Sequence, residues 1–264
     1  MHEEINSVSG QPENDTQKHI APQTPKSEQA PEHHRLLPRA LCYLLATLIA
    51  LVSTVQGVIL LCLVWWSWSP AHQTMFTVSY QLKGIFNEQP EITHQWVDES
   101  GISDHFKRAV ITAEDARFME HFGFDWTGIQ QALKRNDRQG RIVAGGSTLT
   151  QQLAKNLFLT NHRSYLRKAQ EAVIALYIEA LWSKNRILEV YMNSVELGEG
   201  IYGVEAAAQH YFQHSAKTLT QNEAIQLAAM LPNPRHYQVH FNGRGHLARQ
   251  RAIRRYFHHT VIPE

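Results

Sequence analysis

The distribution of apolar residues divides the chain into three kinds of sequence. Residues 1–39 are rich in Gln, Glu, Pro, His and Ser and show almost no aliphatic periodicity. Residues 40–68 contain no charged residue and are mostly apolar. From about residue 103 onward, apolar residues recur at helical spacing in one segment after another. The pattern predicts a disordered tail, one long apolar helix and a mainly α domain.

The apolar run at residues 40–68 predicts a membrane-spanning helix. It is long enough to cross a hydrocarbon core of ~30 Å with some tilt, whereas a cleaved signal peptide has a much shorter apolar region. Trp65, Trp66 and Trp68 gather at its end, as expected for aromatic side chains at the level of the lipid headgroups. A buried core helix is the alternative, but such helices are seldom this long and this free of charge.

Basic residues lie on one side of this run. Lys26, Arg35 and Arg39 precede it, whereas the segment that follows has no basic residue before Lys83. Because loops rich in Lys and Arg stay in the cytoplasm, the tail is predicted to be cytoplasmic and everything after Pro70 to lie outside.

The remainder of the chain is predicted to be a connector followed by helices. Residues 69–102 carry mixed signals, and β-branched patches such as Thr77-Val78 suggest a short strand before a loop at residues 87–90. Thr220 and Glu223 have the spacing of a capping box, and the prolines after Leu231 stop that helix. The predicted helices span residues 104–121, 127–137, 147–158, 164–182, 184–194, 204–212, 220–231 and 247–259.

Charge and cysteine content narrow the class of protein further. The formal net charge of +1 and the pI near 7.9 argue against a nucleic-acid partner, which requires a strong basic field. Cys42 and Cys62 both lie in the apolar run and would stand about 30 Å apart in a helix, too far for a disulfide bond.

A carboxylate pair, Glu114 and Asp115, stands where an apolar helical segment meets a glycine- and aromatic-rich break at residues 122–124. Catalytic groups are often held in this way, because a rigid element fixes them and a neighbouring loop admits substrate. The pair is therefore a catalytic candidate, and a solvated helix face is the alternative.

Residues 145–156 form the second informative stretch. Two glycines precede Ser147, which is expected to cap the following helix. Free N–H groups at a helix start, together with a lysine, suit a phosphate or pyrophosphate, although the pattern is not a nucleotide P-loop. A plain amphipathic face would explain the alternation equally well. At helical spacing, one side of the segment carries uncharged donors and a lysine, namely Ser147, Thr148, Gln151, Gln152 and Lys155.

The third stretch is a basic cluster, Arg163, Arg167 and Lys168, about one turn before Glu171. In a functional interpretation, the cations hold an anionic leaving group and Glu171 orients them. Two alternatives remain open. Lys168 and Glu171 could form an ordinary surface ion pair worth about 0.5 kcal/mol or less, or the cluster could attract lipid headgroups.

Five motif blocks occur in order along the chain. Together they resemble the family 51 glycosyltransferases, the peptidoglycan polymerases, over roughly residues 96–235, and above all the monofunctional members of Gram-negative bacteria. Five ordered blocks are far more specific than one short motif. The SxxK, SxN and KTG set of a penicillin-binding transpeptidase domain is not found. The blocks are EDxxFxxHxGxD from Glu114, GGSTLTQQLAKN from Gly145, RKAQE from Arg167, KNRILEVYMN from Lys184 and GIYGVEAAAQHYF from Gly200.

The resemblance implies a role for each matching position. Glu114 corresponds to the general base, which removes the proton from the 4-hydroxyl of an incoming lipid II sugar. Glu171 corresponds to the second glutamate, which supports the leaving-group region. Lys155 and Arg163 match positions that contact the phosphates of the donor. The further substrate-binding positions expected here are Asp115, Ser147, Thr148, Gln151, Gln152, Asn156 and Lys168.

The resemblance also implies an architecture and a reaction. Residues 103–264 are expected to form a lysozyme-like helical glycosyltransferase domain, with a small apolar jaw near the membrane at residues 122–159. Lipid II would be polymerised into β-1,4-linked glycan, with inversion at the anomeric carbon and release of undecaprenyl pyrophosphate. The expected partners are lipid II, the growing lipid-linked chain, the membrane, and cell-wall synthesis or division proteins. The catalytic domain would be periplasmic, anchored in the inner membrane.

Other interpretations remain open from the sequence. A lysozyme-like lytic hydrolase would share a helical fold and a catalytic glutamate but would not need a phosphate-binding set. An inactive cell-wall scaffold is a further alternative. No cofactor is required from the sequence, but a divalent cation stays open. His210 and His214, at i and i+4, could bind a metal, although two solvated histidines explain them more simply because no third ligand is evident.

Overall fold

A computed structural model describes residues 33–71, 74–86, 91–141, 145–160, 162 and 164–263. The chain divides into two compact units, residues 1–50 and residues 51–264. Most of the predicted disordered tail and the loop predicted at residues 87–90 lie outside the described residues, and so does Arg163.

The long apolar helix is present. Helix α1 spans His33–Trp65, so it begins before the predicted start at residue 40. Its portion Arg39–Trp65 is long and apolar enough to cross a membrane. Most of its large apolar side chains are exposed, as expected for a helix surrounded by lipid and not by a protein core. Cys42 and Cys62 are free thiols, as the spacing predicted.

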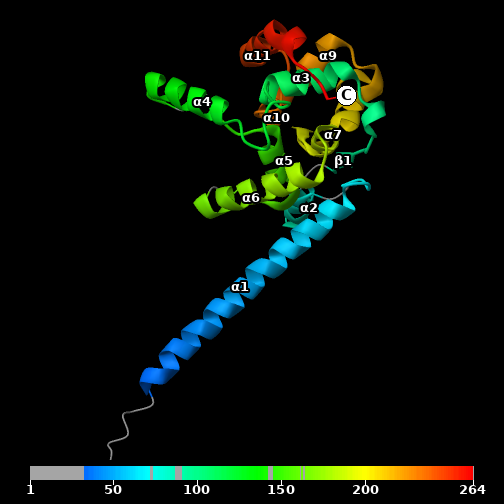
Figure 1. The fold of residues 1–264 in the computed structure, drawn as a ribbon. Coiled ribbons are helices and arrows are strands. Elements are labelled where there is room, and N and C mark those ends of the chain that lie inside the picture. The colour runs from blue at the N-terminus through cyan, green and yellow to red at the C-terminus, as the bar shows by residue number, and fades with distance from the viewer. Residues whose placement is uncertain are drawn as a thin grey trace, which may run out of the picture. The chain divides into compact units, whose positions relative to one another are not determined.

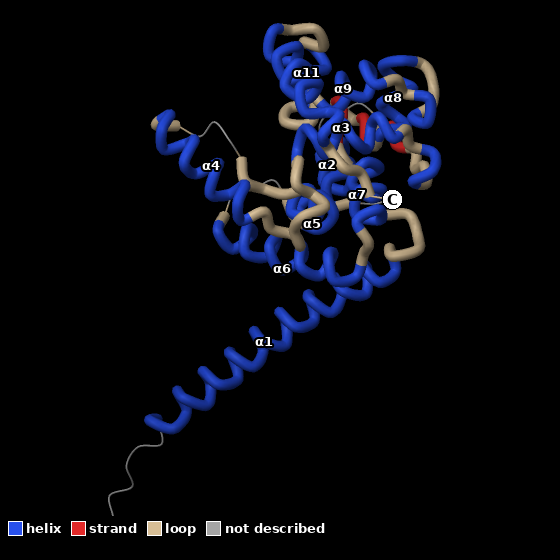
Figure 2. Tube along the Cα trace, turned by 45° about the horizontal axis from the view of Figure 1, so that its top comes forward, coloured by secondary structure: helices blue, strands red, loops and turns tan. Residues whose placement is uncertain are grey.

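Residues 51–264 form a mainly α unit, which confirms the predicted fold class (Figure 1). Helices α3, α9 and α11 pack against one another, and α5 packs against both α6 and α7. Helix α4 projects from the body of the unit in both ribbon views (Figures 1 and 2). The helices are α2 (Met75–Phe86), α3 (Asp104–Glu114), α4 (Trp126–Gln139), α5 (Leu149–Phe158), α6 (Tyr165–Leu181), α7 (Lys184–Ser194), α8 (Val204–Phe212), α9 (Gln221–Ala228), α10 (Pro234–Val239) and α11 (Arg244–Tyr256), with single turns η1 (Glu99–Gly101), η2 (Ala216–Thr218) and η3 (Phe257–His259).

The end of α1 is tied to this unit by polar contacts. Trp182 Nε1 donates to the carbonyl of Leu63 at 2.9 Å, and Gln56 Nε2 donates to Gln170 Oε1 at 3.0 Å. Leu63 is fully buried. The last turns of the apolar helix are therefore part of the folded core.

A small sheet completes the unit (Figure 2). Strands β1 (Thr93–His94), β2 (Glu196–Gly198) and β3 (Ile201–Tyr202) lie in the order β1-β3-β2, with β1 parallel and β2 antiparallel to β3. Gly200 turns the β2–β3 connection with φ of +73°. The sequence did not predict β2 and β3, because segments this short carry too little alternation to recognise.

The connector prediction was wrong at Thr77-Val78, which lie in α2 and not in a strand. Thr74 starts this helix: its Oγ1 accepts from Thr77 N at 3.1 Å, while its own N–H donates to Thr77 Oγ1 at 2.9 Å. This reciprocal cap satisfies two backbone donors, and it outweighs the weak strand preference of the β-branched residues.

Several helix boundaries also differ from the prediction, and α10 was not predicted. The predicted helices at 220–231 and 247–259 are observed as Gln221–Ala228 and Arg244–Tyr256. The predicted helix at residues 104–121 ends at Glu114, because Asp115 leaves the helical conformation with φ of −157° and ψ of 70°. Pro234, predicted only as a stop, occupies the first turn of α10, where its missing N–H costs nothing. The capping box of Thr220 and Glu223 is confirmed.

Candidate active site

Glu114 is the last residue of α3, and its side chain is held by two other helices. Its Oε2 accepts from Gln152 Nε2 of α5 at 3.0 Å, and its Oε1 accepts from Arg249 Nη2 of α11 at 3.2 Å. The side chain is only 13% exposed. The carboxylate is therefore fixed at both oxygens at a junction of three helices.

Gln152 is itself held in place by a hydrogen bond from helix α7. The hydroxyl of Tyr191, on α7, donates to Gln152 Oε1 at 3.0 Å. Burial, reinforced by the charges of Glu114 and Asp115, raises the pKa of Tyr191 well above its ordinary value, so this hydroxyl stays protonated as a donor. The amide of Gln152 can then present only its NH₂ group to Glu114.

The electrostatic surroundings of Glu114 suit a proton acceptor. Burial raises the pKa of Glu114 above its ordinary value, while the hydrogen bond from Gln152 and the charges of Arg249 and Lys155 oppose this rise. A raised carboxylate pKa strengthens the group as a base at neutral pH.

Asp115 connects the end of α3 to the start of α5. Its Oδ1 lies 2.9 Å from His121 Nε2, and its Oδ2 accepts from the backbone N–H of Leu149 at 3.0 Å. The residue is buried. Both oxygens of the Asp115 carboxylate are therefore engaged, and one of them joins the end of α3 to the start of α5, which is consistent with a supporting role beside Glu114.

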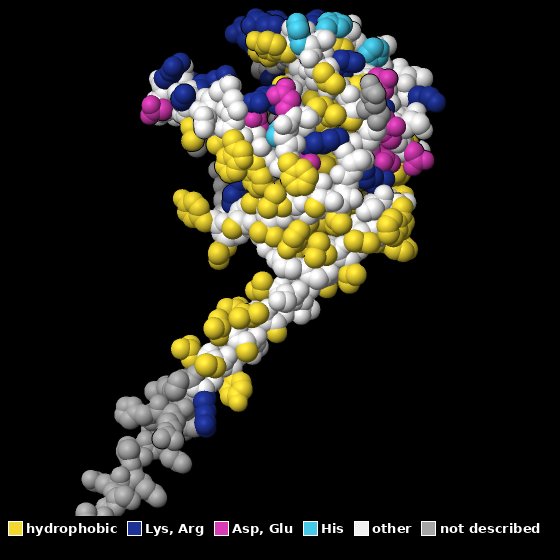
Figure 3. Space-filling view, in the orientation of Figure 1, with side chains coloured by type: hydrophobic (Ala, Val, Ile, Leu, Met, Phe, Trp, Pro, Cys, Tyr) yellow, Lys and Arg dark blue, Asp and Glu magenta, His cyan; other side chains and the backbone are white. Residues whose placement is uncertain are grey.

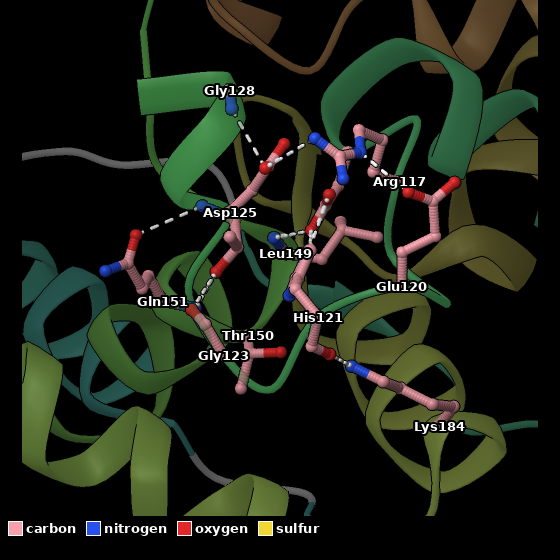
Figure 4. A network of polar contacts seen from close by, with 12 residues as sticks. Arg117, Glu120, His121, Gly123, Asp125, Gly128, Leu149, Thr150, Gln151 and Lys184 are labelled. Atoms are coloured by element: carbon pink, nitrogen blue, oxygen red, sulfur yellow. Dashed lines mark hydrogen bonds and ion pairs between the residues drawn. The ribbon is translucent and has the colours of Figure 1, made fainter. Parts of the chain in front are cut away.

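The turn that follows Asp115 is locked by further polar contacts, which Figure 4 shows around Gly123, His121 and Asp125. Lys184 Nζ donates to the carbonyl of His121 at 2.8 Å. Asp125 Oδ1 accepts from Gly128 N at 2.9 Å and so caps α4. Gly123 adopts φ of +77°, which side chains seldom tolerate.

The cap of α5 differs from the prediction. Thr148, and not Ser147, is the N-cap: its Oγ1 accepts from Gln151 N at 3.2 Å, and Gln151 Oε1 accepts from Thr148 N at 3.1 Å. Thr148 Oγ1 also donates to the carbonyl of Gly123 at 2.8 Å. Both residues are buried, so their side-chain groups hold the helix start. The sequence offered two adjacent hydroxyls, and only the packing against Gly123 selected between them.

A half-open cavity of about 190 Å³ lies beside this network. Glu114 and Asp115 line one side, and the loop from Gly145 to Thr148 lines another. Arg117 and Asp125 also face it. In the space-filling view, acidic and basic side chains gather between the projecting α4 and the body of the unit (Figure 3). The predicted base therefore borders a polar cavity.

Two residues of the predicted basic cluster, Arg167 and Lys168, lie in the first turn of α6. Glu171 of α6 is buried and accepts from Arg167 Nη1 at 2.8 Å and from Lys168 Nζ. Lys168 Nζ also donates to Ser147 Oγ at 3.0 Å. Lys168 and Glu171 are thus more than a surface pair, because Glu171 is enclosed and holds two cations at once.

The charges of both Glu114 and Glu171 act on Lys155. Burial lowers the pKa of Lys155, and so do the charges of Arg167 and Lys168, whereas Glu171 and Glu114 raise it. An anionic group placed beside this lysine would favour its charged form. Lys155 is therefore coupled both to the two glutamates and to the two cations of α6.

The structure brings most of the predicted residues together. Gln152 of α5 bonds Glu114, Asp115 bonds the first residue of the same helix, and Lys168 joins Ser147 to Glu171. Asn156 is buried on α5, and Arg163 lies outside the described residues.

Arg249 and Tyr191 are the site residues that the sequence analysis missed. Tyr191 stands within one of the five motif blocks, so its position offered a signal. Arg249 lies beyond all of them on a helix rich in arginine, and no local pattern distinguishes it from its neighbours.

The two histidines considered for metal binding do not share a helix. Helix α8 ends at Phe212, and Gln213 adopts a left-handed conformation with φ of 63°. His214 therefore lies outside the helix, where its ring contacts Thr218 Oγ1 at 2.9 Å and Glu223 Oε1 at 3.1 Å. The i, i+4 geometry assumed for His210 and His214 is absent.

The network around Asp115 leads to a stability prediction. Replacing Asp115 with asparagine removes a buried charge-assisted acceptor and is expected to lower the free energy of unfolding by about 1–3 kcal/mol. The measurement is the thermal midpoint of the purified protein in detergent. Asp137→Asn, at an exposed position of α4, serves as the control and should leave the midpoint nearly unchanged. Equal midpoints for the two variants would contradict a role of Asp115 in joining α3 to α5.

Fold and site together define a helical enzyme with one long apolar helix, a buried carboxylate that is a candidate base, and two cations paired with a second buried glutamate. Comparison with known sequences gives the particular family. Residues 82–258 match the family model described as Transglycosylase, and the chain belongs to this family. The match begins inside the segment predicted as a connector.

Curated relatives agree over most of the chain. The chain is 54% identical over 202 residues to the biosynthetic peptidoglycan transglycosylase of Acinetobacter baumannii (strain ACICU), covering 76% of this chain and 88% of that protein. It is 48% identical over 219 residues to the protein of the same name in Thiobacillus denitrificans, covering 83% and 94%. The protein of that name in Acinetobacter baylyi is 48% identical over 216 residues, covering 82% and 95%.

Proposed function

We infer that this protein is a peptidoglycan glycosyltransferase that polymerises lipid II into glycan strands. The observation that supports this proposal best is that the buried Glu114 borders a polar cavity, and that Lys168, which is bonded to Glu171, also bonds Ser147 in the lining of the same cavity. The family and its relatives support this class of reaction.

Glu114 acts as the general base in the proposed mechanism. It takes the proton from the 4-hydroxyl of the acceptor sugar as that oxygen attacks the anomeric carbon of the donor. A new C–O bond forms from the face opposite the leaving group, so the configuration inverts from α to β. Positioned proton transfer of this kind contributes about 10²- to 10⁴-fold in rate.

The leaving group in this mechanism is undecaprenyl pyrophosphate. The bond between the anomeric carbon and the phosphate oxygen breaks, and negative charge develops on the pyrophosphate. Lys155, Arg163 and Lys168 are assigned to stabilise this charge, which is the largest need of such a step. Glu171 orients Arg167 and Lys168, and the proposal assigns no cofactor to the reaction.

The other predicted residues are given supporting roles. Ser147, Gln152 and Asn156 are assigned to the donor cleft along α5. Thr148 and Gln151 act by holding the start of that helix in the capping box. Asp115 fixes the junction between the base and the cleft.

Incubation of the purified protein with lipid II tests this function. Glycan polymer and released undecaprenyl pyrophosphate are the expected products. Preformed glycan should remain uncleaved, since the cationic cluster has no purpose in a lytic hydrolase. Cleavage of glycan without any polymer would overturn the assignment, and absence of both activities would favour a scaffold.

The apolar helix is proposed to anchor the enzyme in the inner membrane with the catalytic unit in the periplasm. The one-sided distribution of basic residues supports this orientation. A membrane anchor confines the enzyme to the surface that holds its lipid-linked substrate, which raises their encounter frequency. The jaw proposed at residues 122–159 carries exposed apolar side chains at Phe122, Trp126 and Leu133, which suit a lipid surface.

The orientation leads to a labelling prediction. In a chain with Cys42→Ala and Cys62→Ala, a membrane-impermeant maleimide applied to spheroplasts should label Lys217→Cys, an exposed position. Ser27→Cys, in the tail, should be labelled only after the membrane is permeabilised. The reverse pattern would show that the tail, and not the helical unit, is outside.

A further inference from the structure

Helix α11 reaches the catalytic carboxylate from beyond the last motif block. It packs against α3 and α9, with Ile253 and His246 buried on its inner face. His246 Nε2 lies 2.9 Å from the carbonyl of Gln226 in α9. The helix is therefore firmly seated, and the position of Arg249 on it is determined by this packing.

Arg249 and Gln152 divide the carboxylate of Glu114 between them. Gln152 bonds one oxygen at 3.0 Å, and Arg249 bonds the other at 3.2 Å. The side chain of Arg249 is one-third exposed, and its Nε is buried without a hydrogen-bond partner among the described residues. Among the described residues, the side chain of Arg249 therefore makes its hydrogen bond to Glu114.

Three charged groups act on Glu114. Asp115, directly after α3, disfavours the ionised carboxylate, whereas Lys155 on α5 and Arg249 on α11 favour it. Tyr191 on α7 is kept neutral by burial, as its raised pKa indicates. Lys155 interacts electrostatically with both Glu114 and Glu171, whereas Arg249 donates a hydrogen bond to Glu114 Oε1 at 3.2 Å.

We propose that Arg249 is a positioning residue of the reaction, which fixes Glu114 Oε1 and supplies the positive charge that the buried carboxylate needs in order to act as a base. This inference rests on the role of Glu114 in the proposed function. Gln152 fixes the other oxygen but carries no charge, so it cannot replace Arg249.

The pH dependence of polymerisation tests the inference. Glu114 must be ionised to accept a proton, so activity is lost as pH falls through its pKa. Arg249→Gln removes the favourable charge and is expected to move the acidic limb of the kcat/KM profile upward by about half to one pH unit. Arg249→Lys should shift the limb less, because it keeps the charge. Above the limb, kcat should approach the wild-type plateau.

Arg251→Gln is the matched control, because Arg251 is an exposed arginine of the same helix. Its profile should coincide with that of the wild type. A loss of rate in Arg249→Gln that is equal at every pH would assign Arg249 a structural role only. A raised KM with an unmoved limb would show that Arg249 binds substrate instead. Either result would overturn the proposal.

A titration that does not depend on activity separates this inference from the proposed function. The full chain, labelled with ¹³C at glutamate carboxyl carbons, is titrated in detergent, and the Glu114 signal is assigned by its loss in Glu114→Gln. Arg249→Gln should raise the midpoint of this signal relative to wild type and Arg251→Gln. An unchanged midpoint would disprove the pairing even in an active enzyme, whereas a raised midpoint in a protein that makes no polymer would leave only the function refuted.

Discussion

Glu114→Gln is expected to reduce the rate of lipid II polymerisation by about 10²- to 10⁴-fold. Glutamine has almost the same shape as glutamate, and its amide can still accept hydrogen bonds from Gln152 or Arg249. The buried junction of α3, α5 and α11 should therefore survive, while the ability to take up a proton is lost. The measurement is kcat with lipid II at saturating concentration, together with the thermal midpoint of each protein.

Glu120→Gln provides a matched control for this change. Glu120 is an exposed glutamate that pairs with Arg117 at 2.7 Å and lies only a few residues from the base. Its replacement should leave kcat within about twofold of the wild type, since exposed ion pairs contribute little. Full polymerase activity in Glu114→Gln would show that another group removes the proton.

Glu171→Gln is expected to lower kcat/KM by about 10- to 100-fold. Two cations converge on this buried carboxylate, and a neutral amide holds each of them less firmly by about 1.5–3 kcal/mol for a charge-assisted bond. Arg167 and Lys168 would then lose the position in which the proposed mechanism needs them to stabilise the leaving pyrophosphate. The thermal midpoint should fall too, because the largely enclosed guanidinium of Arg167 keeps no anionic partner on α6.

The loss of phosphate stabilisation can be separated from simple destabilisation. Inorganic pyrophosphate should inhibit the wild type more strongly than Glu171→Gln when both are measured well below their thermal midpoints. Glu199→Gln, which removes an exposed partner of Arg235, is the control and should keep both the activity and the inhibition. Equal inhibition of wild type and Glu171→Gln would contradict the role of Glu171 in organising the cations.

Helix positions were largely predictable, but helix ends were not. Helices α7 and α8 have the predicted bounds, because their apolar periodicity is regular and their flanking residues are clear signals. Helix α3 was predicted to continue to residue 121, and it stops at Glu114 because Asp115 turns to bond Leu149, a residue distant in sequence. Strands β2 and β3 were not predicted, because β3 pairs with β1, which is about a hundred residues away along the chain.

In the candidate site, too, the sequence predicted the position of a helix but not the contacts at its start. The pattern of residues 145–156 predicted a polar face on α5, and Gln152 does reach Glu114 from it. The same pattern favoured Ser147 as the helix cap, whereas contact with Gly123 gives that place to Thr148. Ser147 is left to accept from Lys168. Which of two adjacent hydroxyls caps the helix depends on the tertiary contact that each one makes. The periodicity of the sequence does not contain that contact.

The sequence by itself determined the apolar anchor helix, the helical character of the catalytic unit and the chemical groups available for the reaction. These follow from composition, periodicity and short spacings, which act within a few turns of the chain. Only the tertiary structure decided that Glu114 is enclosed by Gln152 and Arg249, the latter 135 positions away along the chain. Burial and the charges of distant residues set the basicity of a carboxylate, and both arise only when separate helices pack together.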